Sequence, residues 1–398
     1  MPDPRRPVGP AHPAGPTSPS GGTAHPAGPA GPTGPLTLTR PALLAVGGYA
    51  ATRLTGLAVL ALAAAVTGED WLHRLRGRWD SVWYVRVAEN GYGYEATLPT
   101  GAVHSDLAFF PLLPALERGL SAALPLDAAT AGLLVSWTAS LAAAWGLYRC
   151  GAHIAGQRTG VLLAVLWGVY PTAFVQSMAY TESLFTALAA WSLYAVLRAR
   201  WILAGLLCAA AGLTRPTAVA LIAALGVTAL AALVQDRRLP PRTVAGVLIA
   251  PLGWLGHVTY VGVREGAPTA YFAVQAAWGN SIDGGLALAR FIAGLPWPAA
   301  FGLAAALVLL GGLVALCVRQ RQPLPLLVYT VGVVVVSLIG AAYFGSRPRL
   351  MMPAFGLLLP PAAALARLRP RTAVPVLAVL ALASAAYGAF TLLGSGPP

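Results

Sequence analysis

The sequence lacks lysine and is poor in acidic residues. All 26 basic residues are arginine, they outnumber the 13 Asp and Glu residues, and charged residues make up only 10% of the chain. Few stretches show the alternating polar faces that a soluble core of 398 residues needs. The abundance of Ala, Gly, Pro and Arg without Lys indicates a GC-rich genome. These shortages argue against a soluble domain.

The motifs of several common enzyme classes are also missing. The sequence has no dinucleotide-binding glycine loop, P-loop, metal-binding box or Ser-His-Asp arrangement. Cys150, Cys208 and Cys317 lie in or beside apolar segments without metal-ligand spacing, so we interpret them as small hydrophobic residues. We expect neither a metal nor another cofactor. The net charge is +13, but the arginines form short scattered clusters, which argues against nucleic acid as a partner.

Long apolar runs dominate what is present. The chain is 57% hydrophobic, with a mean hydropathy of +0.69. A helix needs about 20 apolar residues to cross a bilayer. We therefore predict an all-α polytopic membrane protein with about eleven membrane helices. They are expected near 41–66, 130–149, 159–176, 182–199, 201–214, 216–234, 243–263, 299–318, 324–343, 350–366 and 372–393.

Arginine counts in the short loops predict the orientation. Twelve arginines lie in the loops that are inside if the N-terminus is cytoplasmic: Arg149, Arg158, Arg198, Arg200, Arg237, Arg238, Arg242, Arg319, Arg321, Arg367, Arg369 and Arg371. Only five lie in the later outer loops: Arg215, Arg264, Arg290, Arg347 and Arg349. Because positive charge favours the inside, we predict a cytoplasmic N-terminus and an outer C-terminus in a multi-pass cell-membrane protein.

The segment 107–126, LAFFPLLPALERGLSAALPL, decides this topology. Counting it as another span would place most arginine clusters outside. Its prolines and the Glu117-Arg118 pair also make it a poor span, so we interpret it as a re-entrant or interfacial element. The first extracytoplasmic loop then covers 67–129, contains short interfacial helices and holds eight of the 13 acidic residues. We therefore expect any chemistry on the outer face.

Two parts of unequal size are expected along the chain. Residues 1–36 consist mainly of Pro, Gly, Ala, Ser and Thr without an apolar face, which predicts a disordered cytoplasmic tail. A cleaved signal peptide has a short apolar core directly after a basic start, and this tail does not show that pattern. Residues 37–398 form the multi-span domain.

The stretch RWDSVWYVRVAENGYG, at 78–93, is polar and aromatic within this apolar chain. In one interpretation, Asp80 or Ser81 caps a short helix that ends at Asn90-Gly91, and the aromatic residues form an interfacial belt. In the other, Asp80 is a general base at the membrane surface, where the polar head of an amphiphilic substrate would lie. The residues alone leave both open.

This stretch also carries a family resemblance. The pattern RWDS-x-WY-x-x-x-AE-x-GY resembles the first luminal loop of PIG-V type mannosyltransferases, which add the second mannose in glycosylphosphatidylinositol assembly. Similar patterns follow in the same order: FFPLLP (109–114), YTESLF (180–185), LTRPTA (213–218) and YFAVQAAW (271–278). The resemblance covers roughly residues 40 to 370 and implies a class C glycosyltransferase. Trp83 departs from it, because eukaryotic members tend to have His there.

The outer-side motifs supply further candidate residues. Glu182 begins a predicted span, where it either complements the helix dipole or holds sugar hydroxyls. Arg215 ends a span of only about 14 residues, about 21 Å of helix. It either lies in a protein-lined pocket, where a cation must be paired and a lipid phosphate is a suitable partner, or snorkels beside Pro216. Arg347 and Arg349 are second candidates for phosphate contact. We also assign Trp79, Tyr84 and Tyr180 to substrate binding from the motifs that contain them.

Two buried residues have other expected roles. Arg53 lies near the middle of the first span and needs a partner, which is either structural or a donor phosphate. His257 is interpreted as a hydrogen-bonded core residue.

The resemblance implies transfer of mannose from polyprenyl-phosphate-mannose by an inverting displacement, with Asp80 as the base. A glycolipid, a glycan and a protein hydroxyl would all fit as the acceptor. Membrane lipids are also expected partners. A multi-span lipid or sugar transporter is the alternative. It predicts inverted repeats and paired charges at the bilayer midplane, but the sequence shows no convincing repeat. A catalytically inactive scaffold is a third interpretation.

Overall fold

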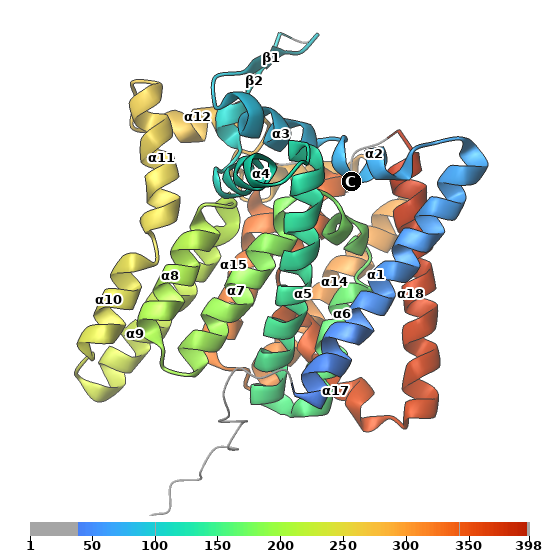
Figure 1. Cartoon of the computed structure of the whole chain (residues 1–398). Coiled ribbons are helices and arrows are strands. Elements are labelled where there is room, and N and C mark those ends of the chain that lie inside the picture. Colours follow the sequence, from blue (N-terminus) through green and yellow to red (C-terminus); the bar gives the residue numbers. More distant parts are fainter. Residues whose placement is uncertain (1–38, 100, 342, 396–398) are drawn as a thin grey trace, which may run out of the picture.

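The computed structural model describes residues 39–99, 101–341 and 343–395. The predicted tail, 1–36, lies outside these residues. The described chain forms a bundle whose longer helices run side by side (Figure 1). These helices are α1 (Arg40–Thr67), α5 (Ala128–Ala155), α6 (Gln157–Gly168), α7 (Thr181–Leu197), α8 (Trp201–Gly212), α9 (Val219–Asp236), α10 (Pro241–Ile249), α11 (Leu252–Arg264), α14 (Trp297–Arg319), α15 (Leu324–Ile339), α17 (Leu359–Arg367) and α18 (Pro370–Leu393).

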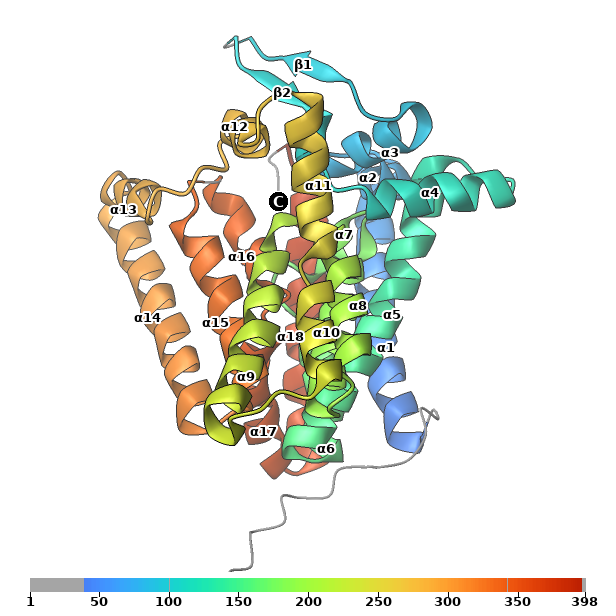
Figure 2. The same ribbon diagram turned by 90° about the vertical axis from the view of Figure 1, so that its left-hand side faces the viewer.

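The prediction of an all-α, multi-span membrane protein is confirmed, but the count of eleven spans is not. Among the described residues, six helical stretches are long and apolar enough to cross a bilayer, and a bent pair makes a seventh. Three shorter apolar helices, α7, α8 and α15, stand in the same bundle (Figure 2). The apolar runs therefore predict where helices lie, but several of these helices are shorter than a full membrane span.

Prolines shorten several of the predicted spans. A residue before proline is disfavoured in the α conformation, and proline itself cannot donate a backbone hydrogen bond. Accordingly, α6 stops before Tyr170-Pro171 and is followed by the 3₁₀ segment η2 (Ala173–Ser177). Pro251 interrupts the helix between α10 and α11, although the two helices together still form one candidate span, Pro241–Arg264. Near Pro353 it bends by 72° between the stretches Phe344–Met351 and Phe355–Arg367.

Small residues allow close packing between helices at the α8 side of the bundle. A Cβ atom on Gly205 of α8 would lie 2.2 Å from the carbonyl oxygen of Gly246 in α10. A Cβ atom on Gly253 of α11 would lie 1.9 Å from the carbonyl oxygen of Ala209. Backbones approach this closely only where side chains are absent, which is a common way of packing helices in membranes. The contacts fix α8, and with it the Arg215 segment that follows.

The first long loop folds into a cap over one end of the bundle, which we call the loop end. Its elements are α2 (Trp71–Arg76), α3 (Asp80–Asn90), β1 (Glu95–Thr97), β2 (Val103–Ser105), the 3₁₀ turn η1 (Asp106–Ala108) and α4 (Leu112–Ala123). The strands form an antiparallel hairpin in which Ala96 pairs with His104. Helix α4 runs across the bundle rather than along it (Figure 2), which agrees with the predicted interfacial element.

Later segments complete the cap. Helices α12 (Ala270–Ala277) and α13 (Leu286–Ala293) also lie at the loop end (Figure 2). Gln275 Nε2 donates to the Ala108 carbonyl at 3.0 Å, and Trp278 Nε1 donates to the Ser105 carbonyl at 2.9 Å. Trp83 packs among Phe109 and Trp278, with ring centroids 5.6 and 4.9 Å away. Its ring therefore packs within the cap and does not form the free interfacial belt of the first interpretation.

The arginine clusters lie mainly at the opposite end of the bundle. The connections from α7 to α8, α9 to α10, α14 to α15 and α17 to α18 meet there (Figure 1). The acidic cap and these arginine-rich connections thus occupy opposite ends. The assignment of the loop end to the outside of the cell stays a prediction from the positive-inside rule.

Glu117 of α4 is buried without a partner. Its side chain is fully buried, and neither carboxylate oxygen has a hydrogen bond within the described residues. The carboxyl lies beside Gly132 of α5, where an added Cβ atom would come within 2.4 Å of Oε1. Burial, and to a lesser degree the nearby Glu89, raises the pKa of the Glu117 carboxyl to about 9. The group is therefore neutral at neutral pH.

The raised pKa of Glu117 makes the stability of the fold depend on pH. Below the unfolded-state pKa both states are protonated, and the fold loses nothing. As pH rises from about 4.5 to 9, the unfolded carboxyl ionises and the folded one does not, which costs about 1.4 kcal/mol per pH unit. Glu117→Gln should therefore raise the unfolding midpoint over the wild type at pH 8, with little difference at pH 4.5. Glu95→Gln on the exposed strand β1 is the control, because Glu95 does not contribute to the raised pKa of Glu117. An equal effect of Glu117→Gln at both pH values would contradict this explanation.

Candidate active site

Asp80 begins α3, but its side chain does not cap the helix. The N-cap residue is Trp79, whose side chain makes no capping hydrogen bond and whose φ is positive, at 51°. Ser81 does not cap the helix either, since its Oγ donates to the Arg78 carbonyl at 2.6 Å. The helix ends at Asn90-Gly91 as predicted, and Gly91 has the expected positive φ of 77°. The interpretation of Asp80 as a helix cap is therefore wrong.

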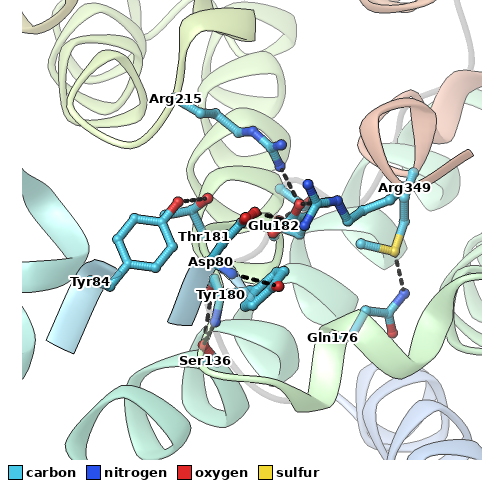
Figure 3. Close-up of polar contacts among 11 residues, drawn as sticks. Asp80, Tyr84, Ser136, Gln176, Tyr180, Thr181, Glu182, Arg215 and Arg349 are labelled. Atoms are coloured by element: carbon cyan, nitrogen blue, oxygen red, sulfur yellow. Dashed lines mark hydrogen bonds and ion pairs between the residues drawn. The ribbon is translucent and has the colours of Figure 1, made fainter. Parts of the chain in front are cut away.

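The Asp80 carboxylate instead pairs with a distant arginine. Arg349 Nη1 of α16 (Arg347–Met351) donates to Asp80 Oδ2 at 2.8 Å (Figure 3). The other oxygen, Oδ1, has no hydrogen bond to the described residues, and the side chain is 32% exposed. The Asp80 backbone N–H donates to the Tyr180 hydroxyl at 3.0 Å. One carboxylate oxygen is thus fixed while the other remains free.

Glu182 connects two arginines behind this pair. Its Oε1 lies 3.1 Å from Arg215 Nη1 and 3.5 Å from Arg349 Nε (Figure 3). Glu182 stands in the first turn of α7, so the helix N-terminus also favours its negative charge. Its side chain is 2% exposed and that of Arg215 is 9% exposed. Arg215 is therefore buried in protein, as the short preceding span predicts, and does not snorkel.

Aromatic and hydroxyl groups hold this cluster in place. The Tyr84 hydroxyl lies 3.2 Å from Thr181 Oγ1, which joins α3 to the start of α7 (Figure 3). Ser136 Oγ of α5 donates to the Tyr180 carbonyl at 2.9 Å. The Arg349 guanidinium stands 5.2 Å from the centre of the Tyr180 ring. Sequence reasoning did not select Ser136 or Thr181, because a hydroxyl in an apolar helix carries no signal of a distant partner.

The four charges balance formally, with two carboxylates and two guanidinium groups. Arg215 Nε is nevertheless buried without a hydrogen-bond acceptor among the described residues, and Arg349 Nε has only the long ion-pair contact of 3.5 Å with Glu182 Oε1. Unmet donors on buried cations favour an additional anion or another acceptor, because an unpaired buried polar group is costly. We call Asp80, Glu182, Arg215 and Arg349 the charge cluster. It can hold an anion between its arginines while Asp80 stands partly open at its edge.

Several predicted residues lie apart from the charge cluster. Arg347 is buried, and it donates to the carbonyls of Ser337, Leu338 and Gly340 at the end of α15, at 3.1, 2.8 and 2.7 Å. Trp79 directs its ring against Arg78, 4.2 Å from the guanidinium carbon. Arg347 is therefore hydrogen-bonded to the end of α15, and the Trp79 ring packs against Arg78. Within the described residues, neither side chain forms a hydrogen bond or ion pair with the charge cluster.

The two buried residues with other expected roles have protein partners. Arg53 Nη1 donates to the Ala173 carbonyl, which lies in the irregular segment η2. The partner of Arg53 is therefore structural. His257 is 2% exposed, and its Nε2 lies 3.2 Å from the Leu107 carbonyl, which confirms a hydrogen-bonded core residue. Within the described ranges, no group of three or more His, Cys, Asp or Glu side chains could hold a metal ion.

Part of the chain matches a known protein family. A family model described as mannosyltransferase (PIG-V) matches residues 55–243, slightly less than half of the chain. This range contains Asp80, Glu182 and Arg215 but not Arg349. A search of curated proteins found no match.

Solved structures show the same fold. ArnT from Cupriavidus metallidurans bound to undecaprenyl phosphate matches with a TM-score of 0.52 and 16% identity, over 81% of this chain and 62% of ArnT. The apo state of the same protein matches with a TM-score of 0.50 and 16% identity, over 78% of this chain and 60% of ArnT. The chain thus spans about three fifths of the length of ArnT. At this identity, the likeness shows the fold.

Removal of the Glu182 charge should destabilise the protein strongly. Glu182→Gln leaves Arg215 buried without a carboxylate, and the loss of one partner of a buried ion pair costs about 3–5 kcal/mol. Glu69→Gln is the matched control, because Glu69 pairs with Arg74 at an exposed site, and exposed pairs contribute under about 1 kcal/mol. Thermal unfolding of both variants in detergent measures the difference. Equal midpoints would show that Glu182 does not compensate the arginines.

Proposed function

We propose that this chain, a PIG-V-type class C glycosyltransferase, transfers mannose from polyprenyl-phosphate-mannose to an acceptor hydroxyl at the loop end. The observation that carries the proposal is the charge cluster. It combines a partly exposed carboxylate, Asp80, with two buried arginines that have N–H groups to spare. A glycosyl transfer from a lipid phosphate needs these two elements: a base for the acceptor and cations for the phosphate.

The proposed reaction is a single displacement that inverts the anomeric carbon. Asp80 Oδ1 accepts the proton of the acceptor hydroxyl, whose oxygen forms a bond to the anomeric carbon. The bond from that carbon to the phosphate oxygen breaks, and the lipid phosphate leaves with the electron pair. The phosphate gains one negative charge while Asp80 becomes neutral, so the total charge of the site is unchanged.

Arg215 and Arg349 fit the role of phosphate ligands. Both guanidinium groups are largely buried, where charge-assisted hydrogen bonds are stronger than in water. They are already held by Glu182, so they need little rearrangement as negative charge develops on the leaving group. The solved ArnT structure is described as bound to undecaprenyl phosphate, which supports a polyprenyl phosphate as the carrier here.

The cap over the cluster belongs to the proposed acceptor side. Helices α3 and α4 and the β-hairpin cover the loop end, where the Asp80 side chain at the start of α3 is 32% exposed. An acceptor would approach between these elements and place its hydroxyl at Asp80. The acceptor is a glycolipid, a cell-envelope glycan or a protein hydroxyl. Adding the enzyme to membranes from a deletion strain and identifying the molecule that gains mannose would decide among these three. The inferred location is the extracytoplasmic face.

Asp80→Asn should abolish most mannosyl transfer. Loss of a general base lowers a rate by about 100- to 10,000-fold, and asparagine keeps the size of the side chain. The assay is transfer of labelled mannose from polyprenyl-phosphate-mannose to membranes from a deletion strain, in detergent and without a gradient. Asp70→Asn is the control, because Asp70 caps α2 through Leu72 N–H and His73 N–H, away from the charge cluster. Wild-type rates in Asp80→Asn would contradict the base assignment, and absence of mannose transfer by the folded wild type would favour the transporter alternative.

Substitution of either cluster arginine should weaken donor binding. Arg215→Gln and Arg349→Gln each remove a charge-assisted hydrogen bond of about 1.5 kcal/mol or more, which is about a tenfold rise in Kd. Tryptophan fluorescence during titration with polyprenyl phosphate measures the Kd on the folded fraction. Arg290→Gln at the exposed end of α13 is the control. If all three variants bind polyprenyl phosphate equally well, the phosphate site lies elsewhere.

A further inference from the structure

Arg78 joins the start of α3 to the last helix of the chain. Its Nη1 donates to the Gly394 carbonyl at 2.9 Å and to the Leu392 carbonyl at the end of α18. The last carbonyls of a helix have no partner within the helix, and a cation there is favoured by the helix dipole. These contacts cross 314 and 316 residues of sequence. The end of α18 and the beginning of α3 are therefore held together by one guanidinium group.

The same guanidinium also holds Trp79. Its central carbon stands 4.2 Å from the centre of the Trp79 ring, within the range of a cation–π contact. The backbone of Arg78 takes part as well, because its carbonyl accepts from both the N–H and the Oγ of Ser81 at 3.2 and 2.6 Å. Arg78 thus fixes the residue before Asp80 through the ring and the residue after it through the carbonyl.

Trp79 needs this restraint because its backbone is strained. Its φ of 51° and ψ of −121° lie in a region that L-residues with large side chains rarely adopt. Such a conformation is strained and persists only where the surroundings enforce it. The Trp79 conformation sets the direction in which Asp80 leaves the turn. A relaxed Trp79 would rotate the Asp80 carboxylate away from Arg349.

We propose that Arg78 is a positioning residue, which holds the Trp79–Asp80 turn against the end of α18 and so aims the Asp80 carboxylate at the acceptor hydroxyl. This inference rests on the proposed function, because it assigns Arg78 an effect on the rate of that transfer. Arg78 acts only through Asp80. Nη1 and the guanidinium face are taken up by the α18 carbonyls and the Trp79 ring, and the donor phosphate falls to Arg215 and Arg349.

The proposal predicts a different effect on kcat than on KM. In Arg78→Ala, the base is misplaced while the phosphate ligands stay, so kcat should fall on the order of 100-fold with an unchanged KM for the donor. Arg78→Lys keeps the positive charge and can still donate a hydrogen bond, but it loses the planar stacking on Trp79. Its kcat should lie between those of Arg78→Ala and the wild type.

Arg76→Ala is the matched control. Arg76 lies two residues earlier and also makes polar contacts across the cap, to Asp127 at 3.2 Å and to Thr130. It does not touch Trp79 in the structure. Arg76→Ala should therefore lose comparable stability and keep the wild-type kcat. Rates are expressed per molecule that binds polyprenyl phosphate, so that misfolded protein does not count.

Two results would overturn the inference. One is a kcat for Arg78→Ala equal to that of Arg76→Ala. The other is an electron cryomicroscopy structure of Arg78→Ala in which Trp79 keeps its positive φ and Asp80 still bonds Arg349; we expect both features to be lost. The structural result does not depend on activity. If the wild type transfers no mannose, the proposed function fails by itself, and the structure still decides whether Arg78 holds the turn.

Discussion

The structure depends on the pairing of buried charges at the loop end. Glu182 is almost completely enclosed, and Arg215 and Arg349 share its carboxylate. Arg349 also forms an ion pair with Asp80, which lies at the edge of the charge cluster. Each of the four residues lies where a helix begins or is interrupted. Irregular backbone at the level of a membrane requires protein around it, so the breaks and the charges are buried together.

The helix interruptions explain how distant segments reach one place. Asp80 starts α3, Glu182 lies in the first turn of α7, and Arg215 precedes the 3₁₀ turn η3 (Pro216–Ala218) between α8 and α9. Arg349 lies in the bent stretch before Pro353. Continuous helices would have carried these side chains along the bundle, away from one another. Pro216 directly follows Arg215, and Pro353 lies at the bend after Arg349, so prolines help to place these two arginines.

The sequence predicted the all-α membrane fold and several members of the cluster, because apolar run length and isolated charges are local signals. Such signals identified Asp80, Glu182 and Arg215 as candidate site residues, and the short span before Arg215 also predicted that this residue is buried and needs a partner. The pairing of Arg349 with Asp80 was not, since 269 residues separate them and only tertiary packing brings them together. Arg347 and Arg349 were also indistinguishable. Residues two apart on a helix face different sides, so one meets the cluster and the other meets the carbonyls of α15.

The central claim is that the charge cluster binds the phosphate of a lipid carrier beside the base. The most direct measurement is an electron cryomicroscopy structure of the protein with polyprenyl phosphate. The account predicts phosphate oxygens within hydrogen-bond distance of Arg215 and Arg349, with the free oxygen of Asp80 facing the space beside the phosphate. A phosphate bound away from both arginines, with the charge cluster unchanged, would contradict it.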